Sequence, residues 1–262
     1  MIFDWLRRRR RRRLLAEPFP GQWLAILASN VAHYAYLSVA EQARLRDDLR
    51  VFVAEKNWEG CAGFAITDEV KVTIAAQACI LLLGMEHDYF SHVPSVLVYK
   101  STFQLPQRRV AGSLELVEDV DFVGQAAYRG AVALAWKDVR RAGRRPHSGY
   151  NVVWHEFAHQ LDMLNSGIDG TPPLRSRDQL RRWQTVMTSE YEQLIEDSES
   201  GRPTLLDEYG ATSEAEFFAV ATEVFFDLPG LMRDDHPSLY ALLAEYYGQD
   251  PAERVPPEAY DN

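Results

Sequence analysis

Residues 153–161 read Val-Trp-His-Glu-Phe-Ala-His-Gln-Leu. His155 and His159 are four residues apart, so in a helix they share one face, with Cβ atoms about 6 Å apart. Two imidazoles at that separation can bind one zinc ion. Glu156 points beside such a metal, where its carboxylate can accept a proton from an attacking water. The flanking residues are apolar and include no proline, as a buried helix requires. The stretch therefore predicts a metallopeptidase helix; the alternative is an amphipathic helix with two hydrogen-bonded histidines.

The third metal ligand must come from elsewhere in the chain. A catalytic zinc usually has three protein ligands and one open position. The motif that continues with a further glycine and histidine is absent, because Asp162 and Asn165 occupy those places. Glu216 and Glu223 are two acids in an otherwise apolar segment, and buried carboxylates need a metal or a partner. Glu216 also stands three residues after Ser213, the spacing of a capping box. Spacing alone leaves both roles of Glu216 open.

A resemblance bears on this choice. His-Glu-Phe-Ala-His at 155–159, together with Tyr209, six residues, Glu216 and Phe-Phe-Ala, resembles the Mlc titration factor A (MtfA) family of bacterial zinc peptidases. The same pair of motifs is similar to the catalytic domain of anthrax lethal factor. Further similar segments are Gln160-Leu161-Asp162, Tyr209-x-Ala211-Thr212, Glu223-Val-Phe-Phe226 and Tyr246-Tyr247-Gly-Gln-Asp-Pro251. The likeness covers roughly residues 20–251 and is strong from about residue 128 onward.

The resemblance implies roles for several residues and a biological context. Glu216 becomes the third zinc ligand, with Glu223 its main competitor, and the Tyr209 hydroxyl lies beside the metal to stabilise an oxyanion. The family also implies a gluzincin-type, aminopeptidase-like activity, binding of the glucose repressor Mlc, and a link to glucose phosphotransferase regulation. A rival function follows: a regulatory protein that sequesters the repressor and has weak or vestigial hydrolase activity. The intact set of His155, His159, Glu156, Tyr209 and Glu216 favours the enzyme, since binding alone does not need Glu156.

Two further acids are candidates for orienting the metal ligands. Asp162 follows His159 by three residues, and Glu223 lies two helical turns after Glu216. Either carboxylate could accept the outer imidazole proton and fix the histidine tautomer. The alternatives are a local bond of Asp162 near the helix end and an arginine partner for Glu223. The remaining histidines lack metal-binding spacing and are expected to be structural or at the surface; they are at positions 33, 87, 92, 147 and 236.

The pattern of caps and apolar residues predicts an α+β protein with a zincin-like fold. It is rich in helices, and a small mixed sheet precedes the motif helix. Helices are expected over 38–57, 68–84, from 148 or 151 to 164, from 176, from 213 to 229 and over 237–247, and strands over 95–99 and 130–136. One domain should span 21–251, with a helical part (21–90) and a part holding the sheet and catalytic helices (91–251). Residues 252–262 should form a loose tail. The strand at 130–136 is the candidate platform for an extended peptide substrate.

Charge is distributed unevenly along the chain. The formal net charge is −10, and because Arg7–Arg13 is an unbroken run of seven arginines, the rest of the chain carries −17. Such an acidic body repels phosphates, so direct nucleic-acid binding by the body is not expected. Residues 1–20 are expected to form a disordered basic tail. The alternative is a polybasic contact with an anionic surface, either lipid or nucleic acid.

The cysteines and the apolar segments indicate a cytoplasmic protein. Glu17 and Pro18 interrupt the chain directly after the arginines, where a secretory signal would need an apolar stretch. Residues 72–85 are apolar but too short to span a bilayer. Cys61 and Cys79 are the only cysteines, and neither is near the motif. A disulfide framework and a purely structural zinc are therefore disfavoured.

Overall fold

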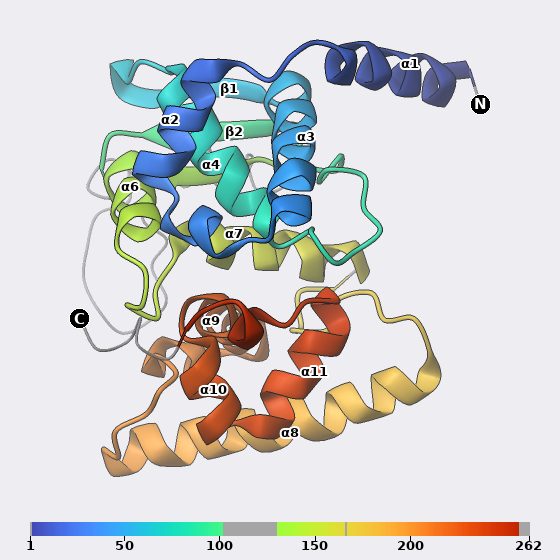
Figure 1. Cartoon of the computed structure of the whole chain (residues 1–262). Helices are drawn as coiled ribbons and strands as arrows, with labels where there is room; N and C mark the ends of the chain where they lie inside the picture. The colour runs from blue at the N-terminus through green and yellow to red at the C-terminus, as the bar shows by residue number, and fades with distance from the viewer. Residues whose placement is uncertain (1, 102–129, 166, 257–262) are drawn as a thin grey trace.

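The computed structural model describes residues 2–101, 130–165 and 167–256. Figure 1 shows three levels: a sheet with helices at the top, the helix α7 (Val152–Asp162) across the middle, and a further group of helices below. The buried hydrophobic side chains form one cluster that extends from Leu27 to Tyr247. The upper and lower levels therefore share one core, with α7 at its centre.

The upper level begins with helices whose caps were visible in the sequence. α2 (Gly21–Asn30) packs on α4 (Asp68–Ile80), and α3 (Val39–Glu55) packs on the same helix. Ser38 and Glu41 form the complete capping box of α3, and the Thr67 side chain accepts a hydrogen bond at the start of α4. The helices expected over 38–57 and 68–84 are confirmed, although α4 ends earlier, at Ile80. These caps supply N–H partners that the first helical turn lacks.

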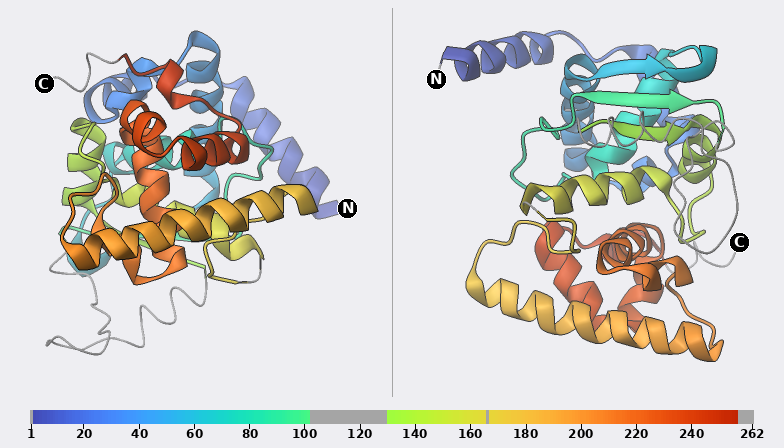
Figure 2. Two further views of the ribbon diagram at one scale, coloured as in Figure 1. Left: turned by 90° about the horizontal axis from the view of Figure 1, so that it is seen from below. Right: turned by 180° about the vertical axis from the view of Figure 1, so that it is seen from behind.

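The sheet is parallel within the described residues, so the expectation of a mixed sheet is wrong there. Its strands are β1 (Asn57–Gly60), β2 (Ser95–Tyr99) and β3 (Val132–Ala135), in the order β1-β2-β3. β1 and β2 run in the same direction. Parallel neighbours need a crossover connection, and α4 lies in the connection between these two strands. β1 was not expected from the sequence. Figure 2 (right) shows β3 as the strand next to α7, and the two elements are in contact.

The lower level is a group of helices around α9 (Glu214–Asp227). α8 (Arg177–Ser200) begins at its cap residue Ser176 and runs along the bottom of the molecule in Figure 1. α10 (Pro229–Asp235) and α11 (Pro237–Tyr247) each have proline as their first residue. Proline is favourable there, because the N–H group that it lacks would have no partner within the helix. Pro229, where the helix from residue 213 was expected to end, therefore also begins α10. α6 (Trp136–Arg144), directly after β3, was not expected.

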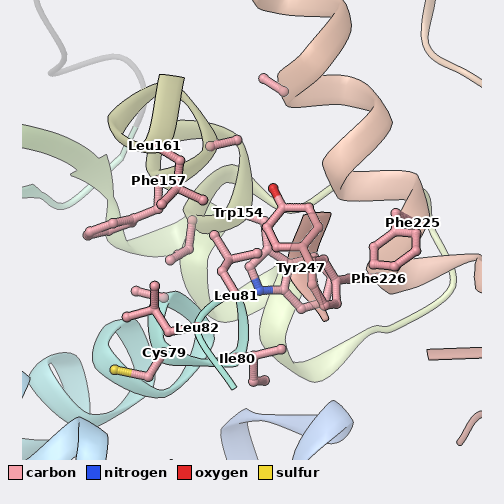
Figure 3. Close-up of a cluster of buried hydrophobic side chains, with 14 of the residues drawn as sticks. Cys79, Ile80, Leu81, Leu82, Trp154, Phe157, Leu161, Phe225, Phe226 and Tyr247 are labelled. Atoms are coloured by element: carbon pink, nitrogen blue, oxygen red, sulfur yellow. The ribbon is translucent and has the colours of Figure 1, made fainter. Parts of the chain in front are cut away.

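The apolar face of α7 sets the direction of its histidines. Trp154, Phe157 and Leu161 are buried in one cluster with residues at the end of α4 and aromatic residues of α9 and α11 (Figure 3). The Trp154 indole N–H donates to the Gln77 carbonyl at 2.9 Å. Trp154 and Phe226 lie with ring centroids 5.5 Å apart. With this face fixed in the core, His155 and His159 lie on another side of the helix, half-buried.

The two ends of the chain differ from the expected tails. Residues Ile2–Ala16 form the helix α1 instead of a disordered segment, and the Arg50 side chain donates to the Glu17 carbonyl at 2.7 Å. At the other end, residues Pro251–Glu253 form a short helical turn, and Val255 is buried. The expected loose tail is therefore ordered up to residue 256, and positions 257–262 lie outside the described residues. Both cysteines are free thiols.

Candidate metal centre

The metal-binding motif lies on α7, whose start is capped by Asn151. The Asn151 side-chain oxygen accepts from the N–H groups of Val153 and Trp154, two groups that the first turn of a helix leaves without partners. One turn further, His155 and His159 stand side by side, with ring centroids 4.9 Å apart. The helix predicted over 151–164 is thus confirmed, and its two histidines point the same way.

Glu216 reaches these histidines from the first turn of α9. Its Oε2 atom lies 2.9 Å from His155 Nε2 and 3.4 Å from His159 Nε2. The three side chains offer ligand atoms that all lie within 4.8 Å of one another. The Ser213 hydroxyl accepts from the Glu216 backbone N–H, so the backbone of Glu216 completes the helix cap while its carboxylate is turned to the histidines. The Glu216 carboxylate is therefore turned to the histidines, and among the described residues it makes no bond back to Ser213 that would complete a capping box.

Glu223 lies on the far side of His155. Its Oε1 atom is 2.7 Å from His155 Nδ1, and Oε2 accepts from the Asn151 backbone N–H. A carboxylate on Nδ1 fixes the ring and leaves Nε2 facing Glu216 and His159. Burial would lower the pKa of His155, but the carboxylates of Glu216 and Glu223 outweigh it and raise the pKa to about 10. His155 is therefore held between two acids.

Glu216 and Glu156 differ in charge environment. Burial would raise the pKa of Glu216, but the two imidazoles outweigh it and lower the pKa to about 2. For Glu156 burial dominates, and the Glu216 carboxylate adds to it, so the pKa of Glu156 is raised. One carboxylate is thus a strong anion beside the imidazoles, whereas the other has the raised basicity of a proton acceptor.

Tyr209 stands at the open side of the cluster. Its ring centroid lies 6.1 Å from that of His155, and the side chain is 54% exposed. The backbone N–H of Tyr209 donates to Asp207, which caps the short helix Glu208–Thr212. Partial burial and the nearby carboxylates of Glu216 and Glu156 raise the pKa of Tyr209. Its hydroxyl therefore keeps its proton at neutral pH and can donate a hydrogen bond.

Asp162 has the local role that the sequence left as an alternative. Its Oδ2 atom accepts from the Gly170 N–H at 2.8 Å, and no hydrogen bond joins it to His159 in the described part of the chain. Gly170 has a φ of +73° and lies so close to α9 that an added Cβ would be 2.4 Å from the Glu214 carbonyl oxygen. Asp162 thus holds the loop after α7 against the start of α9.

A second buried acid joins the two ligand-bearing helices, and sequence reasoning missed it. Asp227 is four residues after Glu223 on α9, so the two carboxylates share a face. Asp227 Oδ2 accepts from the N–H groups of Ser148 and Gly149, both at 2.8 Å, and Oδ1 lies 3.0 Å from His33 Nε2. Two acids of α9 therefore hold the chain entering α7. The sequence feature that could have indicated this role is the pair Glu223 and Asp227, two acids four residues apart in an apolar segment.

Asp227→Asn is expected to reduce the free energy of unfolding by about 2 kcal/mol, the scale of hydrogen bonds to a buried charge. Burial would raise the pKa of Asp227, but His33 and backbone N–H groups outweigh it and keep the pKa below its usual value. A carboxyl group whose pKa is lower in the folded than in the unfolded chain stabilises the folded protein. This stabilisation is complete above the pKa of the unfolded chain, about 3.9, and is lost as the pH falls through the pKa of the folded protein.

Urea unfolding at about pH 7 and about pH 3 measures this effect. The difference in the free energy of unfolding between wild type and Asp227→Asn should be smaller at the lower pH. Asp234→Asn, at an exposed acid in the same part of the chain, is the control and should match wild type at both values. Equal unfolding free energies for wild type and Asp227→Asn at neutral pH would contradict the structural role of Asp227.

The other five histidines have partners away from this cluster. His33 contacts Asp227, His87 contacts Asp48, and His236 contacts Glu190. His92 and His147 bond the backbone carbonyls of Gln160 and Asp227. Their expected structural role agrees with these contacts.

The donor set fits a divalent metal ion. Two imidazole nitrogens and one carboxylate oxygen converge from two helices, with further carboxylates of Glu156 and Glu223 close by. Imidazole and carboxylate ligands suit zinc, and three protein ligands leave a position open for chemistry. A helix-rich α+β protein with such a site has the character of a metallopeptidase.

Comparison with known proteins agrees with that class. The sequence model of the glucose-regulated metallo-peptidase M90 family matches residues 5–248, and the chain belongs to this family. It is 38% identical over 250 residues to an uncharacterized protein of Synechocystis sp., covering 95% of this chain and 90% of the relative. It is also 30% identical to proteins named Mlc titration factor A. One is from Edwardsiella ictaluri, with 84% of this chain and 85% of the relative covered; the other is from Escherichia fergusonii, with 89% and 88% covered.

Proposed function

We propose that this chain is a zinc-dependent, zincin-like peptidase of the gluzincin type, with aminopeptidase-like activity on peptides. The observation that carries the proposal is the approach of the Glu216 carboxylate to both His155 and His159, at 2.9 and 3.4 Å. These three side chains would hold the zinc ion. When bound, zinc supplies a Lewis acid that polarises a carbonyl group and lowers the pKa of water to about 7.

The chain's own residues divide the remaining work. Glu156, whose pKa burial raises, accepts the proton of the attacking water and later delivers it to the leaving amine. The protonated Tyr209 hydroxyl donates to the oxyanion that forms on the substrate carbonyl. β3, at an edge of the described sheet and in contact with α7, is the strand along which an extended peptide would pair.

Metal content and peptide hydrolysis, measured together on wild type and His155→Ala, test this function. Wild type should contain one zinc per chain and hydrolyse peptides, whereas His155→Ala should lose both. His236→Ala removes a histidine that contacts Glu190, remote from the cluster, and should change neither. Wild-type protein that never takes up stoichiometric zinc, or His155→Ala that retains it, would refute the proposal.

A second candidate function is regulatory binding of a transcription repressor. It is supported by the name Mlc titration factor A, which relatives at 30% identity carry. In this function the chain would bind the glucose repressor Mlc, either alongside hydrolysis or with little hydrolysis at all. Capture of purified Mlc by the wild-type chain, measured beside peptide hydrolysis on the same preparation with and without a metal chelator, distinguishes the two arrangements. A chain that does not bind Mlc under either condition lacks this role.

A further inference from the structure

Helix α1 (Ile2–Ala16) is fixed to the body through one side. Its Arg11 guanidinium makes a two-pronged contact with Glu55, at 2.7 and 2.6 Å, and a contact of 2.6 Å with Asp88. The same group lies 4.4 Å from the centre of the Tyr89 ring, and the Arg11 side chain is only 13% exposed. Near the end of α1, Arg50 donates to the carbonyls of Leu14 and Glu17. These contacts set the rotation of α1 about its own axis.

The solvent-exposed side of α1, away from these contacts, carries four arginines, which we call the arginine face: Arg8, Arg9, Arg12 and Arg13. Positions 8 and 12, and positions 9 and 13, are four apart and therefore adjacent on the helix surface. None of the four has a carboxylate partner among residues 5–101, 130–165 and 167–256. Trp5, 53% exposed, lies beside them, with the Arg9 guanidinium 5.3 Å from its ring centre, and Leu6 is 48% exposed.

The arrangement is electrostatically unfavourable in the isolated chain. Like charges four apart on a helix repel each other. The chain outside the seven arginines carries −17, yet the arginine face is turned away from that charge. Figure 1 shows α1 extending beyond the body at the top, with its N-terminal end farthest out. A fixed, protruding and unpaired row of guanidinium groups fits an anionic surface outside the molecule.

We propose that the arginine face of α1 docks on the anionic headgroups of a phospholipid bilayer. Arginines bind lipid phosphates, and an exposed tryptophan next to them suits the headgroup level, where aromatic rings concentrate. A lipid plane can touch the protruding helix alone and stay clear of the acidic body. A nucleic-acid site would be expected to continue as a basic surface over neighbouring elements, and the acidic body offers none. Among the described helices, none combines the length and the apolar character of a membrane span.

The size of the effect follows from the charge count. An arginine near an anionic membrane contributes about fivefold in affinity, so four together contribute on the order of several hundredfold. The attraction is screened by salt, because the Debye length falls from about 10 Å at 0.1 M to about 3 Å at 1 M. Binding should therefore be reversible and sensitive to ionic strength. This docking goes beyond the proposed peptidase function and does not depend on it.

Sedimentation of the full chain with lipid vesicles tests the inference. Wild type should bind vesicles of equal parts phosphatidylcholine and phosphatidylglycerol at about 0.1 M salt, and should lose binding at about 1 M salt or without phosphatidylglycerol. Replacing all four residues of the arginine face by glutamine should weaken binding by at least about 100-fold. Trp5→Ala should weaken it several-fold. A matched control replaces four exposed arginines of the body by glutamine, at positions 140, 181, 202 and 233, and should bind as wild type does.

The following results would contradict docking of the arginine face on a bilayer. The inference fails if wild type does not sediment with anionic vesicles at low salt, or if the four-glutamine variant binds as well as wild type. It also fails if the body control loses binding equally, since net charge alone would then explain it. Tighter binding of wild type to duplex DNA than to the vesicles, lost in the same variant, would assign the arginine face to nucleic acid instead. Circular dichroism of every variant, matched to wild type, verifies the fold.

Discussion

Glu156→Gln is expected to reduce peptide hydrolysis by about 10²- to 10⁴-fold, while zinc content and fold stay as in wild type. The glutamine side chain has nearly the same size, but its amide cannot accept the proton of an attacking water. Glu156 lies outside the group of three side chains whose ligand atoms converge, so its replacement leaves His155, His159 and Glu216 intact. Single-turnover hydrolysis and metal analysis on the same preparation measure both parts of the expectation.

The control for this variant is Glu192→Gln, at an exposed acid of α8. It carries the same chemical change and should hydrolyse peptides at the wild-type rate. Hydrolysis at the wild-type rate by Glu156→Gln would remove Glu156 as the proton acceptor. The variant also separates the two candidate functions, because repressor binding should survive in it.

Glu216→Ala is expected to weaken zinc binding by more than about 100-fold. That is the largest loss of metal affinity typical when a residue that only hydrogen-bonds to a metal ligand is replaced. The variant loses the carboxylate that lies against both histidines. It keeps the helix cap, because Ser213 accepts from the backbone N–H of residue 216, which alanine also has. The loss should therefore appear in zinc affinity and hydrolysis together, without loss of helix α9. Competition with a chromogenic zinc chelator gives the affinity.

Glu214→Ala serves as the matched control, since Glu214 is an exposed acid in the same first turn of α9. It should bind zinc and hydrolyse peptides as wild type does. Unchanged zinc affinity in Glu216→Ala would show that the third ligand is another residue, with Glu223 the nearest alternative carboxylate to His155.

The sequence identified most of the residues of the candidate site because local rules fix them. His155 and His159 share a helix face through their spacing, and Ser213 begins the helix that bears Glu216. The choice of Glu216 as a ligand needed the family resemblance, since a capping box explains the same spacing. Only the tertiary structure shows that the Glu216 carboxylate lies against both histidines, whereas its backbone N–H donates to Ser213.

Other features depend on contacts between distant segments and could not be read locally. α1 was expected to be disordered because its run of seven arginines is typical of a solvated basic tail, yet Glu55 and Asp88 hold Arg11. β1 has only four residues, and its partner β2 lies almost forty residues further along the chain. Asp227 resembled an ordinary acid at a helix end until the structure placed it beside Ser148 and Gly149. In each case the deciding partner comes from a remote part of the sequence.

The double attachment of α9 to the start of α7, through Glu223 and Asp227, has a consequence for metal uptake. The spacing between the histidine pair and Glu216 is set by bonds that do not involve a cation. His155, His159 and Glu216 would therefore hold a metal ion with little rearrangement of the backbone. Affinity then reflects ligand chemistry with only a small entropic penalty, unlike small zinc domains that are unfolded without their metal.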